Sequence, residues 1–231
     1  MSTLEAVEVL APQRLKMSYE EYLDFAGQSE IVEWVDGEAI VYIPPAYIHQ
    51  DIVRFLSQLL DAYIRFLELG TVVLAPFEVK LWADGPSREP DIIFASNENR
   101  LRLTPQRFEG APDLLIEIIS PSSVTEDRVH KFRHYEQAGV REYWIIDPRR
   151  HQQQVDYYVL GEDNAYNPVP LDERGIYHST VLPNFWFDAS WLWQQELPNP
   201  HLILAEIMIS ISDPAPEAKE TYQSLHKLLS K

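Results

Sequence analysis

The most informative stretch of the chain is an apolar run that encloses one acid, residues 114–119 with the sequence LLIEII, in which the acid is Glu117. A second apolar run, residues 92–95 with the sequence IIFA, directly follows Asp91. Short apolar runs bounded by turn residues predict buried strands. An ionised carboxylate in a buried strand is costly unless it is compensated, and a divalent cation compensates two carboxylates at once. Asp91 and Glu117 are therefore candidate metal ligands.

The composition is that of an ordinary globular protein with a strong acidic excess. The 231 residues are enough for one sizeable core, and 45% hydrophobic with 24% charged residues is typical of soluble domains. The chain has no cysteine, which excludes disulfides, thiolate zinc sites and a cysteine nucleophile. The formal charge of −17 opposes loose, non-specific binding to nucleic acid, although a cation and basic side chains in a cleft can reverse the local field.

The sequence carries no recognisable targeting or membrane signal. Residues 1–16 are mixed in polarity, unlike a signal peptide, and no apolar run approaches the roughly 20 residues that a membrane span needs. The lack of cysteine also suits a reducing compartment. We therefore predict a cytoplasmic protein with no membrane partner.

Hydrophobic periodicity predicts a mixed α/β, or α+β, domain over residues 17–190. Helical spacing predicts helices over residues 47–68 and 124–138, and a capping box formed by Ser18 and Glu21 predicts a shorter one before them. The Asp36-Gly37 pair predicts a hairpin turn. Further strands are predicted at residues 71–74, 77–82, 91–95, 113–119, 140–146, 154–160 and 175–182, the last two antiparallel to each other.

The remaining segments are predicted to be less regular. Residues 1–16 form an N-terminal arm, residues 97–112 a polar loop, and residues 191–231 a C-terminal extension that is partly helical, with an amphipathic helix at 217–229. The apolar, proline-broken segment after residue 198 can pack either on a second chain or back on its own domain.

Five motifs together resemble a known family. They are Glu-Pro-Asp at 89–91, Ile-Glu-Ile-Ile-Ser-Pro-Ser at 116–122, the Asp127/Lys131/Tyr135 spacing, Gly-Val-x-Glu-Tyr-Trp at 139–144 and Asp-Pro at 147–148. Over roughly residues 17–190 the chain resembles the Uma-two-type restriction endonucleases of the PD-(D/E)XK nuclease superfamily. The resemblance implies a restriction-endonuclease-like fold, with a mixed central sheet flanked by helices in αβββαβ order. It also implies Mg²⁺, for which Mn²⁺ can substitute, hydrolysis of DNA phosphodiesters, and a possible homodimer.

The resemblance also assigns catalytic roles to residues of this sequence. Asp91 and Glu117 match the two motif acids, and these acids with the carbonyl of Ile118 would be the metal ligands. The superfamily's lysine would fall at position 119, where this chain has Ile119. Lys131, on the following helix, is the candidate for a migrated catalytic lysine.

Accessory roles are predicted for Glu33, His49, Lys80, Ser120 and Asp127, and Glu78 and Glu89 are further possible ligands. Asp127 and Lys131 are four residues apart and so share a helix face. Several alternatives stay open. Asp91 can simply cap its strand, and Glu117 can form a buried salt bridge with Lys131 or Arg133. The whole protein can be a degenerate relative that binds without cutting, or a metal-dependent hydrolase of another nucleic acid or of a nucleotide.

Overall fold

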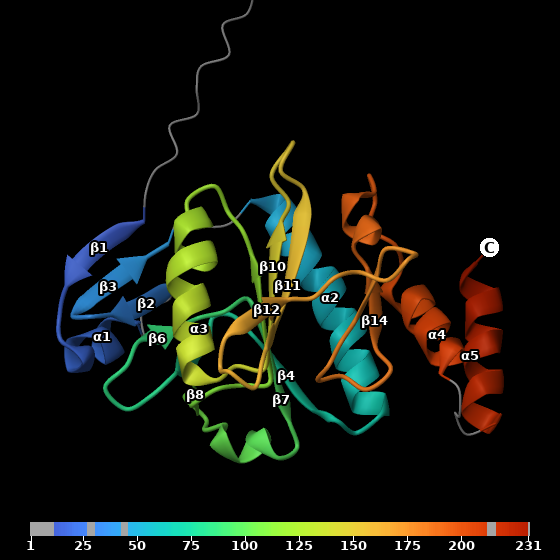
Figure 1. The fold of residues 1–231 in the computed structure, drawn as a ribbon, viewed down its shortest axis with the longest axis horizontal. Helices are drawn as coiled ribbons and strands as arrows, with labels where there is room; N and C mark the ends of the chain where they lie inside the picture. Colours follow the sequence, from blue (N-terminus) through green and yellow to red (C-terminus); the bar gives the residue numbers. More distant parts are fainter. Residues whose placement is uncertain (1–11, 27–30, 43–45, 212–215, 231) are drawn as a thin grey trace, which may run out of the picture.

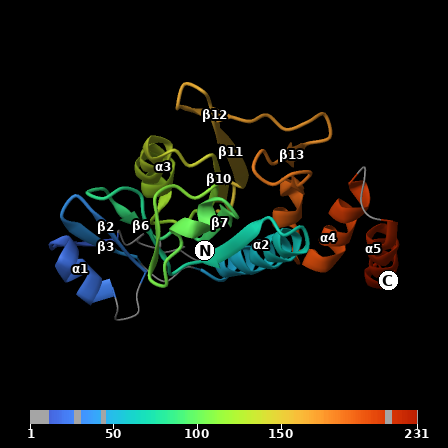
Figure 2. The same cartoon turned by 90° about the horizontal axis from the view of Figure 1, so that it is seen from below.

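The computed structural model describes residues 12–26, 31–42, 46–211 and 216–230. Its elements form an elongated molecule with a central sheet, a smaller sheet at one end and a helical pair at the other (Figures 1 and 2). The helices are α1 (Tyr19–Ala26), α2 (Tyr47–Phe66), α3 (Phe132–Ala138), α4 (Pro200–Ser210) and α5 (Pro216–Leu229), with 3-10 turns η1 (Asn99–Arg102) and η3 (Ala189–Trp193) and the π-helical turn η2 (Glu126–Lys131).

The central sheet has the strand order β12-β11-β10-β9-β7-β4. Its strands are β4 (Gly70–Leu74), β7 (Ile92–Ser96), β9 (Leu114–Ile118), β10 (Glu142–Asp147), β11 (Gln154–Leu160) and β12 (Tyr166–Pro168). Among the described strands of this sheet, β9 and β10 form the one parallel pair, and η2 with α3 supplies the crossover that parallel neighbours require. Along the chain, α2, β4, β7, β9, α3 and β10 give the αβββαβ order, so the predicted fold class is confirmed.

The two faces of the central sheet contribute to different cores, because side chains alternate along a strand. Ile116 and Ile118 of β9 pack in the cluster that contains the apolar face of α2. Leu115 and Ile119 pack in the cluster of Tyr135 from α3. Glu117 has the same parity as Leu115 and Ile119, and this places its carboxylate under the helical layer formed by η2 and α3.

The second sheet has the order β1-β3-β2-β6-β5-β8 and lies beside α1 (Figure 1). Its strands are β1 (Gln13–Lys16), β2 (Val32–Val35), β3 (Glu38–Val41), β5 (Glu78–Lys80), β6 (Ser87–Arg88) and β8 (Arg107–Glu109). The hairpin turn is confirmed, with positive φ at Asp36 and Gly37, and the capping box closes through reciprocal bonds between Ser18 and Glu21.

Three predictions about this region differ from the structure. The strand at 77–82 becomes β5 of the second sheet, because it pairs with β6 and β8 and not with the central strands. The polar loop at 97–112 contains η1 and β8. Residues 13–16 of the predicted arm pair with β3 as β1, whereas residues 1–11 lie outside the described residues.

The C-terminal region packs on the domain that precedes it. The predicted pairing of 154–160 with 175–182 is wrong, since β11 pairs with β12 while β13 (Ile176–His178) pairs with β14 (Trp186–Asp188). Buried residues of α4, including Ile203 and Ile207, join the core that contains α2, and α5 lies against α4. No helix within the described ranges is both long enough and apolar enough to cross a membrane.

Candidate active site

Asp91 and Glu117 lie opposite each other on neighbouring strands. The antiparallel register of β7 and β9 pairs Ile92 with Ile116, so one further step along the ladder places Asp91 opposite Glu117. The backbone N–H of Ile118 donates to Asp91 Oδ2 at 2.7 Å and holds the aspartate against the end of β9. Asp91, Glu117 and Ile118, the three residues predicted as metal ligands, line one narrow cavity of about 50 Å³.

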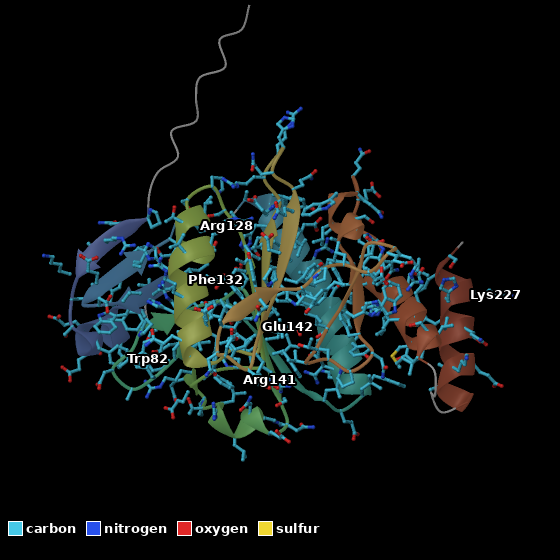
Figure 3. The ribbon with its side chains drawn as sticks, viewed as in Figure 1. Trp82, Arg128, Phe132, Arg141, Glu142 and Lys227 are labelled. Atoms are coloured by element: carbon cyan, nitrogen blue, oxygen red, sulfur yellow. The ribbon has the colours of Figure 1, made fainter. Side chains whose placement is uncertain are left out.

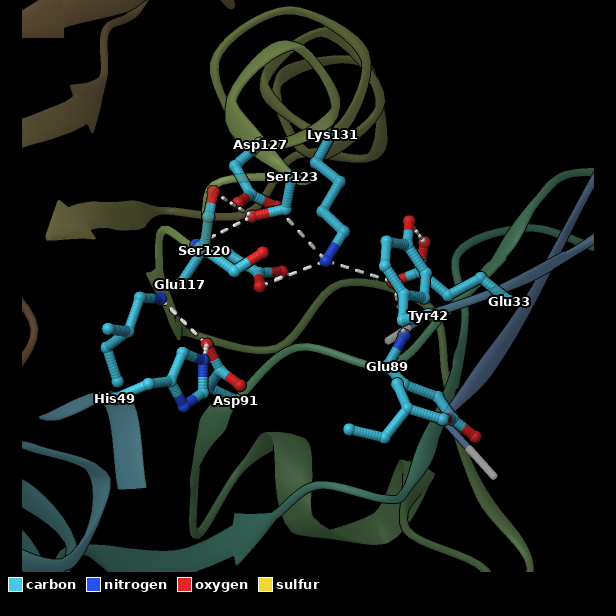
Figure 4. A pocket seen from close by; sticks show the side chains of 12 residues that line it. Glu33, Tyr42, His49, Glu89, Asp91, Glu117, Ser120, Ser123, Asp127 and Lys131 are labelled. Atoms are coloured by element: carbon cyan, nitrogen blue, oxygen red, sulfur yellow. Dashed lines mark hydrogen bonds and ion pairs between the residues drawn. The ribbon is translucent and has the colours of Figure 1, made fainter. Parts of the chain in front are cut away.

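Lys131 reaches this cavity from the helical layer over the sheet. Its Nζ lies 3.0 Å from Glu117 Oε2, 3.0 Å from Glu33 Oε1 and 3.3 Å from Asp127 Oδ1 (Figure 4). The Lys131 side chain is only 5% exposed, so three carboxylates surround one ammonium away from bulk water. The buried salt bridge of Glu117 that the sequence left open is therefore present with Lys131, inside the same cavity as Asp91.

Tyr135 completes the surroundings of Glu117. Its hydroxyl donates to Glu117 Oε1 at 2.7 Å, so both carboxylate oxygens have partners. Burial nevertheless raises the pKa of Glu117 well above its ordinary value, and the negative charges of Asp127 and Asp91 add to this, while Lys131 opposes it. Burial alone would lower the pKa of Lys131, but the carboxylates outweigh it and raise that pKa well above its usual value. Lys131 therefore stays charged at neutral pH.

Glu33 is the most strongly stabilised carboxylate of the cavity. Although burial by itself would raise the pKa of Glu33, Lys131 and Arg88 lower it to about 2. The Arg88 guanidinium is fully buried, with Nη1 2.7 Å from Glu33 and 2.8 Å from Glu126. The Tyr42 hydroxyl also donates to Glu33, at 2.7 Å. Glu33 is consequently ionised, and it helps to hold the Lys131 ammonium from the side opposite Glu117.

The cavity contains more acid than its cations neutralise. Burial, together with the charge of Glu33, raises the pKa of Glu89 to about 8, and burial raises that of Asp127 to about 6. Asp127 Oδ1 is buried, and its contact among the described residues is the ion pair with Lys131 at 3.3 Å. A cavity with several acids and raised carboxylate pKa values is one that an additional cation would stabilise.

The other accessory residues divide into two groups. His49, Ser120 and Asp127 line the cavity, with His49 Nε2 3.2 Å from Asp91 Oδ2. Lys80 of β5 does not line the cavity. The Lys80 ammonium donates to the Gly85 carbonyl at 2.7 Å and lies 3.7 Å from the centre of the Tyr19 ring. Lys80 is thus not brought to the two motif acids.

Glu142 provides a contrast within the same sheet (Figure 3). This β10 carboxylate is fully buried, but it accepts hydrogen bonds from the Trp144 indole and from the hydroxyls of Ser179 and Thr180. Backbone N–H groups of Thr180 and Val181 add to these. A buried strand acid with a structural role is thus surrounded by fixed donors, whereas Glu117 faces a cavity shared with other acids.

Reasoning from the sequence missed several residues of the site, among them Arg88, Tyr42 and Tyr135. Tyr135 had a signal, since it follows Lys131 by four residues and so lies on the same helix face. Arg88 had none, because it contacts Glu33 through the pairing of β6 with β2, strands that are distant in the sequence. Tyr42 directly follows the second strand of the predicted hairpin, close to Glu33 on the first strand.

The fold is that of a restriction-endonuclease-like protein. The chain belongs to the Uma2 family, described as putative restriction endonucleases, whose model matches residues 19–190. A search of curated proteins finds no match. Among solved structures, the chain is similar to a putative nuclease belonging to DUF820 from Anabaena variabilis, with 20% identity and a TM-score of 0.52 over 73% of this chain and 94% of that one. At this identity the likeness concerns the fold alone.

Proposed function

We propose that this protein is a divalent-metal-dependent endonuclease that hydrolyses DNA phosphodiester bonds in the cavity of Asp91, Glu117 and Lys131. The observation that carries the proposal is the Lys131 ammonium, 3.0 Å from Glu117 and next to Asp91 in one buried cavity. Ile119 cannot supply the positive charge expected two residues after the acid, and a helix residue supplies it from above the sheet. Membership of a family of putative restriction endonucleases supports the same reaction class.

The donor set suits Mg²⁺ or Mn²⁺. In the described part of the chain, no three His, Cys, Asp or Glu side chains are grouped so as to hold an ion by themselves. Mg²⁺ does not require such a group, because it commonly keeps several waters and takes one or two carboxylates. Asp91 and Glu117 would be those carboxylates, with Ile118 beside them. When bound, the ion would polarise the scissile phosphate as a Lewis acid and make nearby water more acidic.

The side chains of the cavity have distinct tasks in this proposal. The Lys131 ammonium would stabilise the negative charge that develops on the phosphate and orient the attacking water. Glu33 and Glu117 keep that ammonium in place from two sides, and Tyr135 orients Glu117. Asp91 is held by the Ile118 N–H and by His49. Because these groups are positioned before substrate arrives, little reorganisation would accompany the reaction.

A catalytically degenerate relative that has a binding or regulatory role and does not cut DNA is the second candidate. The observation that favours it is that both oxygens of Glu117 already have partners, Lys131 and Tyr135. In that case the Lys131–Glu117 ion pair would only stabilise the fold. The acidic net charge of −17 adds to this reading, since it disfavours an electrostatic search along DNA.

The test is plasmid nicking and cleavage in Mg²⁺, in Mn²⁺ and in EDTA. Wild type is compared with Asp91→Asn, Glu117→Gln and the control Glu98→Gln, which changes an exposed acid beside η1. We expect activity in the wild type and the control, with losses of about 100-fold or more in the two site variants and in EDTA. Thermal unfolding of each variant shows that a loss of activity is not a loss of fold.

Equal nicking by wild type, Asp91→Asn and Glu117→Gln would refute the proposal. Calorimetry with Mn²⁺ separates the two candidates, because an active site should bind the ion in the wild type and not in Asp91→Asn. A single-stranded RNA and a supercoiled plasmid compared in the same assay decide between RNA and DNA. Sedimentation with and without a DNA duplex tests the proposed homodimer, since double-strand cleavage requires two centres related by the symmetry of the duplex.

A further inference from the structure

A second and larger cavity, of about 440 Å³, adjoins the acid cavity. The two share His49 and Ser120. The remaining lining comes from three places that are distant in sequence: the start of α2 at Ala46 and Ile48, the end of β9 at residues 119–121, and the turn after β10 at residues 148–150. This volume lies in the range of pockets that enclose small organic ligands. None of the roles assigned to the acid cavity uses this space.

One side of the second cavity is apolar. Ile48, Ile119, Pro121 and Pro148 line it. Ile48, in the first turn of α2, is 42% exposed, whereas most later apolar residues of that helix, such as Ile52 and Phe55, are buried. The exposed apolar side chains of Ile48 and Pro121 in this cavity suit a ligand with an apolar surface. The faces of a nucleobase are such a surface, and they are available only when the base is not stacked in a duplex.

The other side of the cavity carries positive charge. Arg149 and Arg150 line it, and Arg150 is exposed and pairs with no acid in the described part of the chain. Arg149 is partly neutralised, because its guanidinium donates to Asp147. The N-terminal end of α2 also lies at this cavity, and the partial positive charge of a helix N-terminus adds to that of the arginines. Together these groups complement a phosphate.

His49 connects the two cavities and has an unused nitrogen. Its side chain is 9% exposed, and its Nε2 is 3.2 Å from Asp91 Oδ2. Its Nδ1 is buried and has no hydrogen-bond partner among the described residues. A buried ring nitrogen without a partner is costly unless a ligand or a water satisfies it. A nucleotide that spans both cavities would provide such a partner.

We infer that the second cavity binds the nucleotide next to the scissile phosphate when that nucleotide is unpaired. The base would lie against Ile48 and Pro121, and its phosphate would face Arg150 and the start of α2. This inference rests on the proposed nuclease function and names its substrate class: single-stranded DNA, or a duplex with an unpaired nucleotide at the cut. A fully paired duplex would leave the apolar wall empty, because its bases remain stacked.

Binding of labelled oligonucleotides tests this inference without any cleavage. Fluorescence anisotropy in EDTA would compare a 20-nucleotide thymidine strand, an abasic strand of the same length, and a paired duplex. The first two strands have equal charge and differ only in their bases. We expect the thymidine strand to bind about fivefold or more tightly than the abasic strand, since one well-placed base contributes that much. The duplex should bind more weakly than the thymidine strand.

Two matched pairs of variants locate the effect. Ile48→Glu should abolish the preference for bases, whereas Leu101→Glu, at a residue 91% exposed on η1, should not. Arg150→Ala should weaken binding of both strands about three- to tenfold and reduce the salt dependence by about one phosphate contact. Arg100→Ala, an exposed arginine on η1, removes the same charge elsewhere and should leave both properties unchanged.

Equal affinity for the thymidine and abasic strands would overturn the inference, as would equal losses in Arg150→Ala and Arg100→Ala. The outcome is separate from that of the proposed nuclease activity. Base-dependent binding without Mn²⁺-dependent cleavage would refute the nuclease and keep the subsite. Cleavage of plasmid with no preference for bases would keep the nuclease and refute the subsite.

Discussion

Replacement of Lys131 by methionine tests the electrostatics of the acid cavity most directly. Methionine keeps the length and apolar stem of the side chain but removes the ammonium that lies within 3.3 Å of Glu33, Glu117 and Asp127. Leaving a buried charge without its partner costs about 3–5 kcal/mol. Glu33 retains Arg88 at 2.7 Å, so most of the cost falls on the other two acids. We expect Lys131→Met to lower the free energy of unfolding by that amount at pH 8.

The loss of unfolding free energy caused by Lys131→Met should become smaller as the pH falls. The pKa of Asp127 in the folded state is about 6 and that of Glu117 is raised well above its ordinary value, so both bind protons in the folded protein at a pH where the unfolded chain has released them. Once protonated, neither acid needs the ammonium. The difference between wild type and Lys131→Met should therefore be largest at pH 8 and fall to about 1–2 kcal/mol at pH 5.

Urea unfolding at pH 5, 6.5 and 8 measures this difference, with Lys80→Met as the control. Lys80 is also a buried lysine, but within the described residues no carboxylate lies within salt-bridge distance of its ammonium. The loss of unfolding free energy in Lys80→Met should therefore be the same at every pH. Addition of Mn²⁺ at pH 8 should recover part of the stability of Lys131→Met and none of that of Lys80→Met. A loss in Lys131→Met that does not change between pH 5 and pH 8 would refute this account of the cavity.

Three further predictions concern Glu89, Tyr135 and the helix α4. Burial raises the pKa of Glu89 from 4.5 to about 8, so the folded state binds the extra proton and stability falls as the pH rises between these values. Glu89→Gln should remove this decline and raise the unfolding free energy at pH 8 by at most about 4 kcal/mol, as urea titrations at pH 5 and pH 8 would show. Tyr135→Phe removes the hydrogen bond to Glu117 and should lower the free energy of unfolding by about 1–3 kcal/mol. Because that bond favours the ionised carboxylate, its loss should move the pH profile of cleavage to higher pH. An unmoved profile would contradict this role of the contact. Ile207→Ala, at a fully buried residue of α4, should lower the free energy of unfolding by about 2–5 kcal/mol in urea, because α4 packs on the core of its own chain; a loss below about 1 kcal/mol would speak against that packing.

Much of the candidate site is visible in local sequence patterns. Asp91 and Glu117 each stand beside or within an apolar run, and two such runs separated by a loop are natural neighbours in a sheet. The spacing of four between Asp127, Lys131 and Tyr135 places them on one helix face by helical geometry alone. These patterns depend only on residues close together in the chain, which is why the sequence could indicate the acid pair and its lysine.

Contacts between distant segments were not predictable in the same way. The Glu78-Val79-Lys80 tripeptide has the acid-x-lysine pattern, yet β5 joins the second sheet and takes Lys80 away from the acids. Arg88 reaches Glu33 only because β6 pairs with β2, a contact between residues far apart in sequence. The sequence by itself therefore determined which residues can share a strand or a helix face. The tertiary structure alone decided which acids surround Lys131, because strand order depends on how the whole chain buries its apolar surface and not on local periodicity.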